Sequence, residues 1–129
     1  MWESQPGHVH MLMRSTRGVL YRSDSMDYGD SWCEAYSTTV PNNNSGIDLV
    51  KAGESLILVC NPVPGNWGER TPLSILVSED NGRSWSSPIH LETAAGEYSY
   101  PAVIAQDGLL HVTYSWNRRS IAYHCLQWL

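Results

Sequence analysis

Arginine side chains carry the most specific chemistry available in this chain. It has eight Lys and Arg residues, and all except Lys51 are arginine. A guanidinium group can hold a carboxylate through two parallel hydrogen bonds, which an ammonium group cannot do. Arg14 ends an apolar run, where a charge must be paired or lie at a rim, and Arg70 lies in a Gly- and Pro-rich stretch. From position alone, Arg14 could form a structural ion pair and Arg70 could be a solvated loop charge; a role in a pocket is considered below.

Metal, redox and cofactor chemistry have weaker sequence support. His8 and His10 would share one face of a strand, but no third ligand follows at a recognisable spacing. The three cysteines are an odd number and form no CxxC motif, so a disulfide framework is not expected. We therefore predict no metal site and no cofactor.

Composition excludes several classes of partner. A formal net charge of −5 argues against nucleic acid. No apolar run reaches the length that crossing a membrane requires, so we expect no membrane partner. The first residues lack the basic and apolar pattern of a secretory signal. Reduced thiols favour a cytoplasmic location, although the sequence leaves the compartment undecided.

One eight-residue pattern occurs twice. The spacing Ser-x-Asp-x-Gly-x-x-Trp is found at Ser25, Asp27, Gly29 and Trp32, and again 53 residues later at Ser78, Asp80, Gly82 and Trp85. Ser and Asp side chains accept hydrogen bonds from nearby backbone N–H groups in tight turns, and Gly supplies a positive φ. The pattern therefore predicts a rigid hairpin turn with a structural role. A repeat at this period indicates a stacked or radial architecture.

The elements around these turns read as short strands with no convincing helix. The strand-like runs are bounded by Gly, Pro, Asn and Asp, and Asp107-Gly108 is a strong hairpin signal. Overlaying the repeats gives a unit of four antiparallel strands. The strands are expected at 8–15, 19–25, 47–51, 56–61, 73–78, 100–105, 109–116 and 121–126, with weaker ones at 35–39 and 88–91 and a stub at 2–4.

The repeated turn resembles the Asp box of sialidases and other bacterial-neuraminidase-repeat proteins. Three further segments are similar to sialidase segments in the same order: 11–14 with 21–23, 70–78 and 96–101. The resemblance implies an all-β fold, a partial β-propeller of about three four-stranded antiparallel blades. It corresponds to the C-terminal half of a six-bladed domain, with blades at approximately 1–41, 42–95 and 96–129.

The same resemblance implies site residues. Arg14 and Arg70 match segments that carry the second and third arginines of a carboxylate-binding triad, and Tyr98 or Tyr100 matches the nucleophile. A neutral tyrosine suits the crowded, negatively charged reaction centre of a sialic acid. Asp48 and Glu97 are candidates for pocket carboxylates.

The expected function follows with its alternatives. In the family, the first triad arginine and the acid/base aspartate lie in blades before those of this chain. The chain is therefore expected to hold part of an acidic-sugar pocket of a sialidase-like glycoside hydrolase, inactive or weakly active alone. The alternatives are a non-catalytic module that binds glycan or protein through aromatic loops, including Trp67 and Trp116, and a remnant that only folds or assembles. About three blades cannot close a ring, so a homodimer of about six blades is expected.

Overall fold

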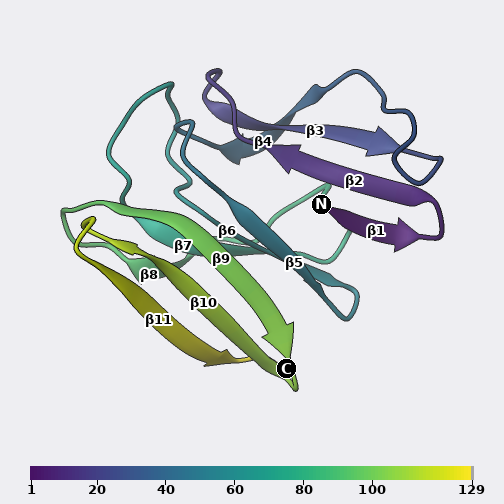
Figure 1. The fold of residues 1–129 in the computed structure, drawn as a ribbon. Helices are drawn as coiled ribbons and strands as arrows, with labels where there is room; N and C mark the ends of the chain where they lie inside the picture. The colour runs from purple at the N-terminus through teal and green to yellow at the C-terminus, as the bar shows by residue number, and fades with distance from the viewer. Residues whose placement is uncertain (129) are drawn as a thin grey trace.

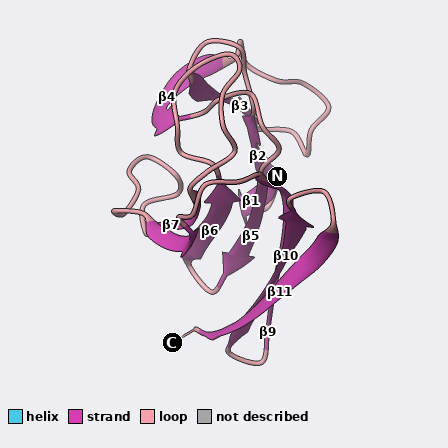
Figure 2. Cartoon of the chain, turned by 90° about the vertical axis from the view of Figure 1, so that its left-hand side faces the viewer, coloured by secondary structure: helices cyan, strands magenta, loops and turns pink. Residues whose placement is uncertain are grey.

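The chain folds entirely into strands, turns and loops. A computed structural model describes residues 1–128, and Figure 2 shows strands and loops but no helix in this range. The predicted all-β class is therefore confirmed. The strands are β1 (Trp2–Gln5), β2 (His8–Met13), β3 (Val19–Ser25), β4 (Tyr36–Pro41), β5 (Asp48–Ala52), β6 (Ser55–Cys60), β7 (Leu73–Ser78), β8 (Ile89–Glu92), β9 (Tyr98–Gln106), β10 (Leu109–Trp116) and β11 (Ser120–Gln127).

Three antiparallel sheets follow one another along the chain. Their strand orders are β1-β2-β3-β4, β5-β6-β7-β8 and β11-β10-β9. We call them blades 1, 2 and 3. Figure 1 shows them side by side in sequence order, with blade 2 between its neighbours. Strand β1 is a full member of blade 1, whereas the sequence predicted only a stub there.

Blade 2 is buried on both faces. The run Leu56–Cys60 in β6 is apolar throughout and fully buried, which is typical of a strand covered on both sides. Its alternate side chains contribute to two cores. The core shared with blade 3 includes Ile57 and Val59, and the core shared with blade 1 includes Leu58 and Cys60.

Blade 3 leaves one face uncovered. Its inner face packs on blade 2 through residues such as Val103, Val112 and Tyr114. On the outer face, Ile104, Ile121 and Tyr123 are 57, 70 and 58% exposed. The outer face of blade 3 thus carries several large apolar side chains that are exposed in the described residues.

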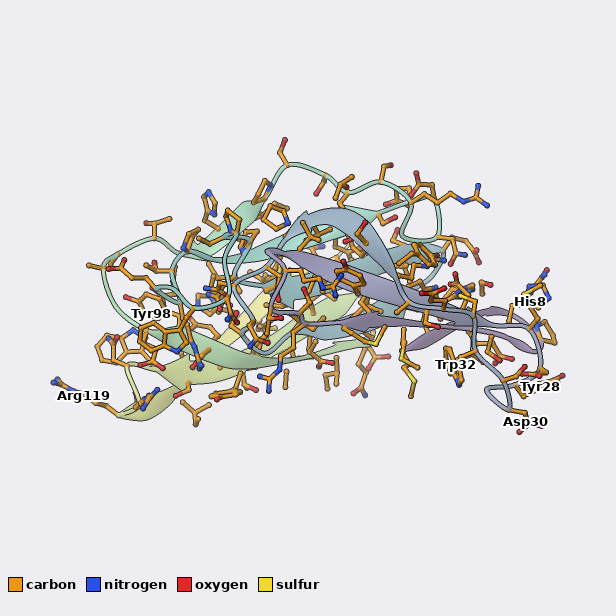
Figure 3. The ribbon with its side chains drawn as sticks, turned by 90° about the horizontal axis from the view of Figure 1, so that it is seen from above. His8, Tyr28, Asp30, Trp32, Tyr98 and Arg119 are labelled. Atoms are coloured by element: carbon orange, nitrogen blue, oxygen red, sulfur yellow. The ribbon has the colours of Figure 1, made fainter. Side chains whose placement is uncertain are left out.

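The antiparallel order places the connections at two ends. The β1–β2, β3–β4, β5–β6, β7–β8 and β9–β10 connections share one end, which we call the turn end. The remaining connections share the opposite end, the loop end. Figure 3 shows Tyr28 and Trp32 at the turn end and Tyr98 and Arg119 at the loop end. Across residues 1–128 no helix has the length and apolar character needed to traverse a bilayer.

Candidate functional site

A polar hollow opens at the loop end. It has a volume of about 490 Å³ and collects side chains from all three blades. Its lining residues are Arg14, Asn43, Asn44, Asn66, Trp67, Gly68, Glu69, Arg70, Gly96, Glu97, Tyr100 and Arg118. We call it the arginine hollow. The two arginines singled out in the sequence therefore face one space.

Loop hydrogen bonds hold Arg70 in place. The Arg70 carbonyl accepts a hydrogen bond of 2.9 Å from the Tyr98 backbone N–H. The amide of the buried Asn61 donates to the carbonyls of Pro72 and Tyr98, at 2.9 and 3.0 Å. The side chain of Asn43 donates to the Glu69 carbonyl at 2.9 Å. The loop is thus tied to blades 2 and 3 on both sides of Arg70.

The two candidate tyrosines have different surroundings. In a regular strand, residues i and i+2 share a face, yet Tyr98 is 2% exposed and Tyr100 is 60% exposed. The pairing of β9 with β10 shifts between Thr113 and Ser115, opposite Tyr100. Tyr100 has a φ of 53°. This left-handed residue in a bulge changes which face the following side chains occupy.

Tyr98 belongs to the core rather than to the arginine hollow. Its ring packs edge-on against Tyr114, with ring centroids 6.4 Å apart, and it is absent from the hollow's lining. Of the two candidate tyrosines, Tyr100 is the one that lines the hollow together with Arg14 and Arg70.

Tyr100 lies directly against a positive charge. The Cζ atom of Arg70 is 5.0 Å from the centre of the Tyr100 ring. The adjacent Arg70 guanidinium, with smaller contributions from the charges of Arg14 and Arg118, lowers the pKa of Tyr100.

Glu97 balances part of the arginine charge. Its Oε1 lies 2.9 Å from Nε of Arg118 and 3.6 Å from Nη1 of Arg70. The hollow is lined by three arginines and only two carboxylates, Glu69 and Glu97. One guanidinium charge is left in excess, which suits an anionic ligand.

Asp48 has a structural role outside the hollow. The Asp48 carboxylate accepts a hydrogen bond of 2.8 Å from the Val103 backbone N–H, linking blades 2 and 3. It does not line the arginine hollow, so the sequence-based substrate-binding role is not supported by its position.

Sequence reasoning gave too little weight to three contributors. Arg118, in the β10–β11 connection, lines the hollow although its side chain is 72% exposed. Its place after the second strand of a blade, as at Arg14 and Arg70, was the available signal. Gly46 leaves room for Tyr100, because a Cβ there would lie 3.2 Å from the tyrosine ring. Trp67 is 92% exposed at the same hollow.

The two repeated turns lie away from this hollow, at the turn end. We call them box turn 1 (Ser25–Trp32) and box turn 2 (Ser78–Trp85). In each, the serine Oγ accepts from the glycine N–H at 2.8 Å. The aspartate Oδ1 accepts from the N–H of Ser31 or Ser84, also at 2.8 Å. These bonds match the predicted turn chemistry.

Comparison with known proteins places the chain in a family. A model of the BNR repeat-like domain matches residues 1–112. The chain belongs to this family. No curated protein matches the chain.

Solved structures share the fold of this BNR repeat-like chain at low sequence identity. The K499G mutant of NanB sialidase from Streptococcus pneumoniae matches with a TM-score of 0.76 and 17% identity, over 97% of this chain and 22% of that one. NanB in complex with 2-[(3-chlorobenzyl)ammonio]ethanesulfonate matches with a TM-score of 0.77 and 16% identity, over the same shares. The intramolecular trans-sialidase from Ruminococcus gnavus in complex with oseltamivir carboxylate matches with a TM-score of 0.72 and 17% identity, over 97% of this chain and 31% of that one. The chain thus spans less than a third of each matched structure.

Proposed function

We propose that this chain supplies the carboxylate-binding part of a sialidase-like pocket and binds an acidic sugar in the arginine hollow. The observation that carries the proposal is the meeting of Arg14, Arg70 and Arg118 around Tyr100. Guanidinium groups bind a carboxylate by charge-assisted hydrogen bonds. Two of the structurally similar sialidases were solved with a sulfonate or a carboxylate ligand, which is consistent with an anion-binding pocket.

Within this proposal, Tyr100 is the nucleophile equivalent. It is the tyrosine that faces the hollow, and Arg70 favours its phenolate. A phenolate attacking the anomeric carbon would give a glycosyl-tyrosine, the variation on carboxylate catalysis that sialidases use. The resemblance places the first triad arginine and the acid/base aspartate in earlier blades, so efficient hydrolysis by this chain alone is not expected.

Binding is tested with N-acetylneuraminic acid by titration calorimetry or NMR. Arg70→Ala should weaken binding at least about tenfold, which corresponds to about 1.4 kcal/mol. Arg70→Lys should weaken it in part, because the charge stays but the planar fork is lost. Arg17→Ala is the control, since Arg17 stacks over Tyr21 outside the hollow. Absence of saturable binding, or equal loss in the control, would contradict the proposal.

Turnover distinguishes a hydrolase from a binding module. With a fluorogenic sialoside, the chain should turn over more slowly than about 1 per second, the lower end of the usual enzyme range. Binding without turnover would fit the alternative of a non-catalytic glycan-binding module that uses Trp67, which is exposed at the hollow. Turnover within the usual range would show that the catalytic set is complete.

The state of Tyr100 can be measured directly. Because the pKa of Tyr100 is lowered, its phenolate absorbance should appear earliest in an alkaline titration. The Tyr100→Phe variant should lose that first step. If the step persists in the variant, another group is responsible and the assigned role is wrong.

We further propose that two copies associate through the outer face of blade 3. The exposed side chains Ile104, Ile121 and Tyr123 give this face an apolar surface, and two copies would supply about six blades. Light scattering should give twice the mass of one chain. Ile121→Lys should shift the mass to one chain, whereas Glu54→Lys, exposed at the turn end, should not. A monomeric wild-type protein would overturn this assembly.

A further inference from the structure

A second hollow lies at the turn end, between blades 1 and 2. Its volume is about 640 Å³, and it is lined by Ser4, His10 and Asp24 from blade 1 and by Asn81 from box turn 2. We call it the serine hollow. It is separate from the arginine hollow, with which it shares no lining residue.

Three of its side chains form a continuous hydrogen-bonded chain. The Oγ atom of Ser4 lies 2.8 Å from Nε2 of His10. The Nδ1 atom of His10 lies 2.5 Å from Oδ1 of Asp24. A serine, a histidine and a carboxylate joined in this order are the arrangement that activates a serine hydroxyl as a nucleophile.

The strand register brings these side chains to one face. His10 in β2 is paired directly with Asp24 in β3 and with Trp2 in β1. Ser4 lies in the irregularity between Glu3 and Gln5, where β1 carries an extra residue relative to β2. Such bulges re-aim side chains and are common beside active sites. Here the bulged residue is the one whose hydroxyl meets the histidine.

The surroundings assign the histidine tautomer. Tyr36 and Arg22 donate hydrogen bonds to Asp24, at 2.5 and 2.9 Å. Although burial raises the pKa of Asp24, these bonds and the one with His10 lower it overall, so the carboxylate is ionised at neutral pH. An ionised oxygen 2.5 Å from Nδ1 requires a proton on that nitrogen, and the longer 3.2 Å contact of Arg22 Nη2 with Nδ1 is then not a hydrogen bond. In the neutral ring, Nε2 is the acceptor and faces the Ser4 hydroxyl.

Asn81 adds a second neighbour to the histidine. Its Oδ1 accepts from the Trp2 indole N–H at 2.7 Å, which sets the orientation of the amide. Its Nδ2 then lies 3.5 Å from Nε2 of His10, on the same side of the ring as Ser4. Box turn 2 therefore helps to fix the position of the histidine ring.

We propose that Ser4, His10 and Asp24 form a second catalytic site, one that hydrolyses small esters of carboxylic acids. Ser4 Oγ attacks the ester carbonyl carbon and its proton passes to Nε2 of His10. The bond to the alcohol breaks, and the alcohol leaves with that proton. Water then attacks the acyl-serine and gives its proton to Nε2. The acid is released as the proton returns to Ser4. Asp24 is a positioning residue, and Arg22 and Tyr36 hold it.

The first test is covalent labelling of the whole chain. A fluorophosphonate probe should modify Ser4, as located by peptide mass spectrometry, and Ser4→Ala should abolish the labelling. The matched control is Ser37→Ala, because Ser37 lines the same hollow but makes no hydrogen bond to a histidine within residues 1–128, unlike Ser4. Labelling of Ser37 instead, or no labelling of any serine, would overturn the proposal.

The second test is hydrolysis of p-nitrophenyl acetate. Ser4→Ala should reduce the rate by about a hundredfold or more, the usual contribution of such a nucleophile–base pair. Asp24→Asn should lower both rate and labelling while Ser4 stays in place. Thermal melting confirms that each variant is folded, and Ser4→Ala is mild because it removes one side-chain hydrogen bond. An unchanged rate in folded Ser4→Ala would refute the site.

Discussion

Box turn 1 and box turn 2 have nearly identical internal hydrogen bonds and very different surroundings. Box turn 1 is exposed: Tyr28 at its tip is 73% accessible, and the indole N–H of Trp32 donates to the Gly29 carbonyl of its own turn at 2.9 Å. Box turn 2 is docked on blade 1. The backbone carbonyl of Asn81 accepts a hydrogen bond of 2.7 Å from the Arg22 guanidinium. The side-chain oxygen of Asn81 accepts a hydrogen bond from the Trp2 indole N–H.

The difference shows that one local pattern serves two purposes. The Ser, Asp and Gly positions make the turn, because their hydrogen bonds lie within the turn. The residues between them decide what the turn touches. Box turn 1 contacts the β1–β2 turn of its own blade, where the Tyr28 N–H donates to the Gly7 carbonyl at 3.0 Å, whereas box turn 2 packs on the neighbouring blade and closes the serine hollow.

The largest expected contrast is between the two glycines. A Cβ at Gly82 would lie 3.1 Å from Nη1 of Arg22 and 3.4 Å from the Trp2 ring, whereas at Gly29 the nearest atom is the Trp32 ring at 3.6 Å. Both have positive φ, so valine costs about 1–3 kcal/mol of strain in either turn. Gly82→Val should add about 1–3 kcal/mol of overpacking. Chemical denaturation of both variants measures this, and equal losses would refute the docking.

The second largest contrast is expected between the stability losses caused by replacing the two tryptophans, Trp85 and Trp32. Trp85 packs against the core between blades 1 and 2, whereas Trp32 covers its own turn. Since both are only partly buried, Trp85→Ala should cost about 2–3 kcal/mol, below the range for a fully buried tryptophan, and Trp32→Ala about 1 kcal/mol. A larger loss at Trp32 in the same denaturation experiment would show that box turn 1 is the more integrated of the two.

Glycine substitutions at the tips of the two turns should change the stability of the protein in opposite directions. Tyr28 and Asn81 both have φ near 60°, where glycine is unstrained. Tyr28→Gly should stabilise the protein by about 0.5–1 kcal/mol, because a bulky residue there is strained. Asn81→Gly should destabilise by about 1 kcal/mol, because the bond to Trp2 is lost. The melting temperatures of the two variants, measured together, should lie on opposite sides of the wild-type value.

The fold was predictable from the sequence because its signals are local. The repeated turn bonds to itself, and the alternating runs around it pair with their immediate neighbours along the chain, so spacing alone led to four-stranded units. The apolar run at 56–61 was likewise predicted as a strand, and the structure places a strand at Ser55–Cys60. Most predicted strand boundaries differ from those in the structure by only one or two residues.

The candidate site was less predictable because it depends on one backbone irregularity. Tyr98 and Tyr100 are two residues apart, so alternation assigns them to the same face, and only the bulge with φ of 53° at Tyr100 separates them. Bulges leave no composition signal. The partnership of Ser4 with His10 was missed for the same reason, since it also arises at a bulge.

The smallest expected contrast concerns the turn aspartates. Hydrogen bonds from Ser31 and Ser25 lower the pKa of Asp27 to about 2, and those from Ser84 and Ser78 lower the pKa of Asp80 to about 2. A carboxyl whose folded pKa lies below its unfolded value of 3.8 stabilises the fold above about pH 4 and loses this contribution as the pH falls toward 2.

The stability advantage of wild type over Asp27→Asn and over Asp80→Asn should therefore shrink between pH 5 and pH 2.5. Because hydrogen bonds within the turns are the largest causes of both pKa shifts, the two curves should coincide despite the different surroundings. Asp30→Asn is the control, since the Asp30 side chain makes no hydrogen bond within residues 1–128. Melting temperatures across this pH range test the prediction. If the stability advantage over Asp80→Asn begins to fall at a higher pH than the advantage over Asp27→Asn, then docking on blade 1 alters the pKa of Asp80, which would contradict the prediction.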